Sequence, residues 1–116
     1  MAAPNIVSPT TVTLKAVNTT VGTSAITIVT CGSNKAVKLS SLVAANITAT
    51  NASVTLRFND GTATHAICSS VVVPANASLL VVTRDNPVYL EEGKSVQAVA
   101  GATGAIHVVA SYEEIA

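Results

Sequence analysis

The sequence predicts an all-β protein, an antiparallel β-sandwich or jelly-roll-like fold with about eight or nine short strands. Short runs rich in Val, Ile and Thr alternate apolar and polar residues with a period of two, as half-buried strands do. Turn-forming residues separate these runs at roughly ten-residue intervals, which is typical of sandwiches and jelly rolls. No segment carries the apolar stripe of an amphipathic helix.

Length and composition predict one domain with an aliphatic core. The chain has 116 residues, within the usual size of a single domain. Hydrophobic residues make up 49% of the chain but aromatic residues only 3%, so the core must consist of Val, Ile, Leu and Ala. Residues 1–10 contain Pro4 and Pro9 and no periodic pattern, so we expect an extended N-terminal arm there. Residues 11–116 are expected to form a single β-sandwich domain.

The first half of the domain contains four expected strands, residues 11–16, 25–31, 36–48 and 53–58. A turn is expected over residues 18–24. The third run is so long that we expect a bend or bulge near Ser40 and Ser41, with one helical turn in residues 40–50 as the alternative. One face of this strand is expected to consist of Val37, Leu39, Ser41, Val43, Ala45 and Ile47.

The second half of the domain begins with a strong hairpin signal. Asn59-Asp60-Gly61-Thr62 contains the Asp-Gly pair that favours tight β-turns, so residues 64–73 should return antiparallel to residues 53–58. Residues 85–87, 91–94 and 101–104 are expected turns. The remaining expected strands are residues 79–83, 88–90, 96–100 and 105–112.

Charge is sparse, which favours a surface that other protein covers. Charged residues make up 10% of the chain, against about 25% in an ordinary domain, and the net charge is zero. A well-behaved monomer coated in Ser and Thr is the alternative. Residues 1–58 carry only cations and residues 59–116 carry all the acids. Copies could dock head to tail if the two halves lie on different faces, whereas interleaved strands would remove the asymmetry.

Composition argues against nucleic-acid, membrane, metal and cofactor partners. The few cations are dispersed, and aromatic platforms for bases are scarce. No apolar run approaches the roughly 18 residues that span a bilayer, and the N-terminus lacks the features of a secretory signal. We therefore expect synthesis in a cytoplasm, with Cys31 and Cys68 reduced. Metal-ligand spacings and glycine-rich phosphate loops are absent from the sequence.

The sequence also predicts that the chain is not an enzyme. His65 and Cys68 are three residues apart, and an odd spacing on a regular strand puts two side chains on opposite faces. The carboxylate pairs Glu91-Glu92 and Glu113-Glu114 lie beside a turn and at the chain end, where they are expected to be solvated. We expect no catalytic residues.

Four short segments resemble small virion structural proteins of tailed bacteriophages, especially cyanophages. They are MAAPNIV at the start, PANAS at residues 74–78, VYLEEGKSV at 88–96 and VVASYEEI at 108–115. The resemblance implies a capsid decoration (cement) protein located in the virion. Its partners would be further copies of itself, often in a trimer, and the major capsid protein or another virion protein.

A tail, neck or fibre component, such as a host-surface or carbohydrate-binding module, is the alternative function. Only Tyr89 and Tyr112 could stack on a sugar ring there. For either function we predict that the arm adds as a strand to a neighbour's open sheet edge and that turn tips contact the partner. The candidate interaction residues are Pro4, Asn5, Ile6 and Val7 in the arm and Asp60, Glu91 and Glu92 at the turn tips.

Overall fold

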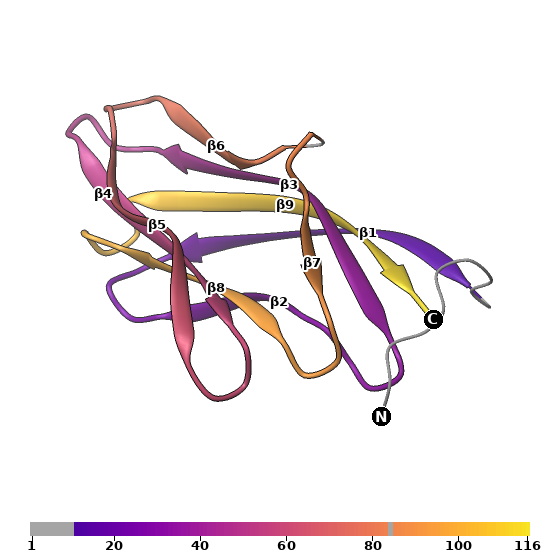
Figure 1. Cartoon of the computed structure of the whole chain (residues 1–116). Coiled ribbons are helices and arrows are strands. Elements are labelled where there is room, and N and C mark those ends of the chain that lie inside the picture. The colour runs from indigo at the N-terminus through magenta and orange to yellow at the C-terminus, as the bar shows by residue number, and fades with distance from the viewer. Residues whose placement is uncertain (1–10, 84) are drawn as a thin grey trace.

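Two antiparallel β-sheets pack face to face in a computed structural model that describes residues 11–83 and 85–116 (Figure 1). The nine strands are β1 (Val12–Val21), β2 (Ile26–Thr30), β3 (Ala36–Asn46), β4 (Ala52–Asn59), β5 (Thr64–Val73), β6 (Ser78–Val82), β7 (Val88–Leu90), β8 (Ser95–Ala100) and β9 (Ile106–Ile115). No helix occurs within these two ranges. The predicted all-β fold is therefore confirmed, whereas the predicted arm, with Pro4, Asn5, Ile6 and Val7, lies outside the described residues.

The strand order is that of a jelly roll. One sheet runs β1-β9-β3-β6, and the other runs β2-β8-β4-β5. Short β7 also pairs with β3, beside Val37–Leu39, while β6 pairs with the same edge of β3 further along. β6 and β7 together therefore act as one interrupted edge strand of a five-stranded sheet.

The core between the sheets is aliphatic, as the composition predicts. Fully buried side chains come from both sheets and none of them is aromatic; the largest are Leu39, Leu42, Leu56, Leu90 and Ile106. Phe58 and Tyr112 only border this core. Burying a Leu or Ile side chain contributes about 1.5–3 kcal/mol, so the aliphatic core is the main source of stability.

A bulge in β3 changes which residues of this strand face the core. Leu39 pairs with Tyr112 and Ser41 with Ser111, so Ser40 is an extra residue without a partner on β9. The alternation changes phase there, and the residues buried beyond the bulge are Leu42, Ala44 and Asn46. The bulge lies where the sequence predicts it. The predicted common face is wrong beyond Ser40, because Val37 and Leu39 point to the core whereas Val43 and Ala45 point outward. The alternative of a helical turn is wrong as well, since residues 36–46 are a strand.

Strand β1 is longer than the sequence predicts. Asn18, Thr19 and Thr20 belong to the strand and pair with β9 up to Val21 and Ile106, so the expected turn over residues 18–24 is wrong in its first half. Thr has a high strand propensity, and pairing with β9 overrides the turn tendency of a single Asn.

Buried Asn46 holds together the end of the sandwich where β3 and β5 finish. Its side-chain amide donates to the carbonyl oxygens of Thr50 (2.8 Å) and Val73 (2.9 Å). Its Oδ1 atom accepts from the Thr48 backbone N–H (2.9 Å) and the Thr48 hydroxyl (2.7 Å). All the polar atoms of this buried side chain are thus paired, as burial of an amide requires.

Candidate interaction surface

The outer face of the five-stranded sheet exposes most of the large apolar side chains. Alternation from the buried positions of β3 and β9 places the even-numbered residues of β1 on this face, with Val43, Val109, Leu80 and Tyr89. Eight large hydrophobic residues are exposed in the described ranges. Five of them lie here, with these exposed fractions: Val12 54%, Leu14 76%, Leu80 65%, Tyr89 64% and Val109 52%. We name this surface, defined by those five residues and Val43, the apolar face.

Neighbouring positions make the apolar face continuous across three strands. Val109 of β9 lies opposite Val43 of β3, and Val43 lies opposite Leu80 of β6. Another row places the opposite charges of Glu113 and Lys38 side by side, between Leu14 of β1 and Tyr89 of β7. Contiguous exposed apolar surface marks sites of protein contact, so this face is the candidate interaction surface.

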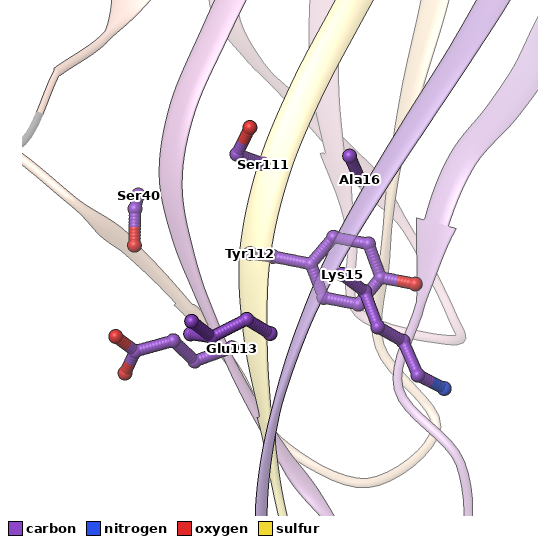
Figure 2. A pocket seen from close by; sticks show the side chains of 7 residues that line it. Lys15, Ala16, Ser40, Ser111, Tyr112 and Glu113 are labelled. Carbon is purple, nitrogen blue, oxygen red and sulfur yellow. The ribbon is translucent and has the colours of Figure 1, made fainter.

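Two open depressions follow the seam between β1 and β9 on this side of the molecule. One, of about 380 Å³, surrounds the β3 bulge, and small side chains such as Ala16, Ser40 and Ser111 leave it hollow (Figure 2). The other, of about 430 Å³, is lined from Asn18 to Thr20 and by His107 to Val109. Three metal-ligating side chains do not gather anywhere in the described part of the chain.

The Asp60 turn forms as predicted, and its carboxylate is used within the turn. Gly61 has a φ of 95°, and its N–H donates to Asn59 Oδ1 (2.8 Å). Asp60 Oδ1 accepts from the N–H groups of Ala63 and Thr62, both at 2.8 Å. The hydrogen bond from Ala63 is the main cause, and that from Thr62 the second, that holds the pKa of Asp60 below its ordinary value.

The Glu91-Glu92 turn lies beside the Asp60 turn, and both carboxylates contact the chain itself. A Cβ atom on Gly61 would lie 3.8 Å from the Gly93 carbonyl oxygen, which shows how close the two turns are. Glu92 Oε2 accepts from the Asn34 N–H (2.9 Å), and Glu91 pairs with Lys94 (3.2 Å). The structure therefore brings the predicted tip residues together at one end, where they also tie loops to one another.

Glu114 joins the basic first half of the chain to the acidic second half. Its carboxylate lies 3.0 Å from the Lys15 ammonium and 3.4 Å from that of Lys35. The hydrogen bond from Lys15 is the main cause that lowers the pKa of Glu114 and raises that of Lys15. Because strands from both halves interleave, the charge asymmetry of the sequence is not separated in space, and head-to-tail docking by charge loses its basis.

Both cysteines are free. Cys31 is buried, its thiol donates to the Lys35 carbonyl oxygen (3.2 Å), and burial raises its pKa. The odd-spacing argument for His65 and Cys68 does not apply, because a register shift in β5 intervenes. The shifted register places His65 opposite Phe58 and Cys68 opposite Leu56. No hydrogen bond joins the His65 and Cys68 side chains in the described structure.

Sequence reasoning missed the apolar face, although a signal for it was present. Leu79-Leu80 and Val108-Val109 are adjacent apolar pairs, each within a longer run of apolar residues. In a strand, two adjacent side chains point to opposite faces, so one member of each pair must leave the core. Leu80 and Val109 are the exposed members of these pairs.

Comparison with known proteins identifies the fold but not a family. No protein-family model and no curated protein matches the chain. A helix long and apolar enough to cross a membrane was not found in the part of the chain that the structure describes.

Two solved structures share the architecture. One is a protein of Bacillus endospore appendages, which form a novel family of disulfide-linked pili, with TM-score 0.55, 16% identity, and coverage of 90% of this chain and 85% of that one. The other belongs to the T13 viral particle of IBDV, with TM-score 0.53, 9% identity, and coverage of 93% of this chain and 32% of that one. This chain thus spans about a third of the viral protein's length. The chain has a fold that occurs in pilus and virus-particle proteins, and at these identities the likeness concerns the fold alone.

Proposed function

We propose that this chain is a non-enzymatic virion structural protein, most specifically a capsid decoration (cement) protein that self-associates and stabilises a head shell. The apolar face carries the proposal. Its Val109, Val43 and Leu80 side chains are continuous across three strands. Its charged pair, Lys38 and Glu113, lies between the exposed Leu14 and Tyr89. Its fold also occurs in proteins of a pilus and of a viral particle. The sequence segments that resemble phage virion proteins supply the more specific assignment.

The size of the apolar face favours a role in a lattice over a tight one-to-one complex. Covering five side chains that are already partly buried in the sheet contributes on the order of 5 kcal/mol. Association of two free molecules costs an estimated 4–15 kcal/mol in lost freedom, so this face alone gives weak pairing. Many copies on one shell bind together with avidity, which makes weak individual contacts sufficient.

The remaining candidate residues have subordinate roles in this proposal. The arm with Pro4, Asn5, Ile6 and Val7 adds as a strand to an open sheet edge of a neighbouring virion protein of another kind. The end that bears Asp60, Glu91 and Glu92 forms a second, polar contact. Both roles are predictions, and the microscopy of the intact particle described next tests them.

Cryo-electron microscopy of the intact particle tests the function directly. We expect density for this chain on the shell between neighbouring capsomers, with the apolar face against protein. A matched pair of variants tests the face itself. Leu80→Lys, on the apolar face, should lose particle occupancy, and Val72→Lys, exposed on the other sheet, should keep it. Absence of the chain from particles would contradict the proposal.

A tail, neck or fibre module that binds host carbohydrate is the second candidate. Tyr89 favours it, since its ring is exposed on the apolar face and aromatic rings stack on sugars. Density at the tail or neck, together with glycan binding that is lost in Tyr89→Ala, would establish this function in place of decoration.

A further inference from the structure

The free edge of β1 is the feature from which a specific contact can be derived. Among residues 11–83 and 85–116, β1 pairs with β9 alone, in an unbroken register of ten residue pairs from Val12–Ile115 to Val21–Ile106. Just before it, Thr11 and Ala116 exchange two backbone hydrogen bonds of 3.0 and 2.9 Å. Such pairs alternate with non-bonded pairs along an antiparallel ladder. Odd-numbered residues of β1 therefore bond to β9, and even-numbered residues direct their N–H and C=O groups to the free edge.

The same even-numbered residues carry their side chains onto the outer side of the sheet. They are Val12, Leu14, Ala16, Asn18 and Thr20. A strand added at this edge would pair their backbone groups. It would also cover the flank of Leu14, the most exposed large apolar side chain in the described ranges. Edge and apolar face thus belong to one contact surface.

The other sheet edges are irregular, and β1 is not. β2 has a register shift between Thr27 and Val29, and β5 has two shifts and a positive φ of 48° at Ser70. The β6–β7 edge is interrupted between its two strands, where Pro87 lies. Irregularities of this kind protect edges against pairing. Residues 12–21 contain no Pro, no Gly and one charge, Lys15, which is paired with Glu114.

We propose that β1 of a second copy pairs antiparallel with this edge and joins two five-stranded sheets into one. This inference rests on the proposed function, since it names the contact through which subunits associate. The length of the free edge indicates that β1 of a second copy, and not the N-terminal arm, pairs with it. The chain before Thr11 has Pro4 and Pro9, which lack an N–H group, so at most four consecutive donors lie between them. Only an equally long regular strand matches the ten residues of β1.

The pairing is self-complementary. Residues directly opposite point to the same face, so even-numbered residues must meet even-numbered ones. With a two-fold axis at Ala16, Leu14 meets Asn18 of the other copy and Lys15 meets Val17, which avoids like charges. The arrangement adds about ten backbone hydrogen bonds and makes the two apolar faces continuous.

Sedimentation velocity of the full chain over a concentration series tests the contact. Wild type should form a dimer, and Ala16→Pro should raise the dimer dissociation constant at least about tenfold. The N–H group of Ala16 faces the free edge, so proline at this position removes no hydrogen bond to β9. Circular dichroism should therefore show that the fold persists. The control Ala16→Thr keeps the N–H and should dimerise within a few-fold of wild type.

A second variant pair keeps the test decisive if proline disturbs folding. Ala16→Lys places a charge at the edge, whereas Ala45→Lys places it on the outer side of β3, away from the edge. We expect about tenfold weaker dimerisation only for the former. A wild-type chain that stays monomeric, or self-association that ignores both Ala16 variants, would overturn the proposal.

The outcomes separate this contact from the proposed function. Particles that carry the chain on the shell with β1 unpaired overturn the dimer and leave decoration intact. A β1-paired dimer in solution from a chain that is absent from particles overturns decoration and leaves the dimer intact.

Discussion

The outer faces of the two sheets differ although both sheets are built from Val- and Thr-rich strands. The five-stranded sheet presents the apolar face, with five exposed large hydrophobic residues. The four-stranded sheet presents polar side chains over most of its outer surface, among them Thr27, Ser53, Thr55, Arg57 and Gln97. Val72, on its edge strand β5, is the exposed large hydrophobic residue there.

The two outer faces therefore differ in apolar exposure. A monomer needs only one apolar face per sheet, the one that meets the core. The four-stranded sheet follows that rule closely. The five-stranded sheet does not, because Leu80 and Val109 add apolar surface that contributes nothing to the core. The following predictions test whether this division of roles is real.

Deleting Val43 should have the largest effect, because the residue count beyond the bulge decides which side chains of β3 face the core. Without Val43, Leu42 and Ala44 become adjacent and must point to opposite faces, so one of these two buried side chains leaves the core. We expect a loss of more than about 3 kcal/mol of unfolding free energy, measured by urea denaturation. Deleting Ser40 is the control and should cost much less, because Leu39 and Ser41 pair with adjacent residues of β9 and the later residues keep their faces without it. An unchanged urea midpoint after the deletion of Val43 would contradict this dependence on register.

Asn46→Ala should have the next largest effect and would show that a polar residue on the inner side is structural. It removes four hydrogen bonds, two of them to the Val73 and Thr50 carbonyls, of which Thr50 keeps the bond from the Thr48 hydroxyl. We expect a loss of about 3 kcal/mol by thermal or urea unfolding. The matched control is Asn51→Ala, an exposed residue with one 3.2 Å bond to the Ala75 N–H. It should cost less than about 1 kcal/mol.

Leu80→Lys should change stability by no more than about 0.5 kcal/mol, in contrast to the inner residues. Its side chain already lies in water, so charging it removes contact surface and not core. Retention on a hydrophobic-interaction column should fall more for Leu80→Lys than for Val72→Lys, because only Leu80 belongs to a continuous patch. Equal losses for both variants would remove the distinction between the two faces.

Acid should remove the small contribution that the Glu114 carboxylate makes to folding stability. Its folded pKa lies below its ordinary value of 4.5, so its contribution is fully present above that value and disappears as the pH falls through the folded pKa. Glu114→Gln should therefore lower the urea midpoint at neutral pH and flatten its fall in acid. Glu113→Gln is the control on the same strand. The slope that remains in Glu114→Gln is expected from Asp60, whose pKa is lowered too.

Much of the fold could be predicted because its signals are local. The alternation in residues 53–58 and the Asp60-Gly61 pair predicted the β4–β5 hairpin, and the structure has it with the expected turn bonds. The candidate site was harder. Asp60, Glu91 and Glu92 were predicted as contact tips because turns are exposed, yet their carboxylates bond within the chain. Such partners come from other loops and leave no local trace.

The sequence by itself determined the all-β class, the nine strand positions to within a few residues, the Asp60 hairpin and the aliphatic core. It could do so because the period of side-chain alternation and the chemistry of turns act within a few residues. Tertiary structure decided the phase of β3 beyond Ser40, the extension of β1 to Val21 and the outward direction of Leu80. Each of these depends on the register of a partner strand distant in sequence, and register follows from the packing of the whole sheet.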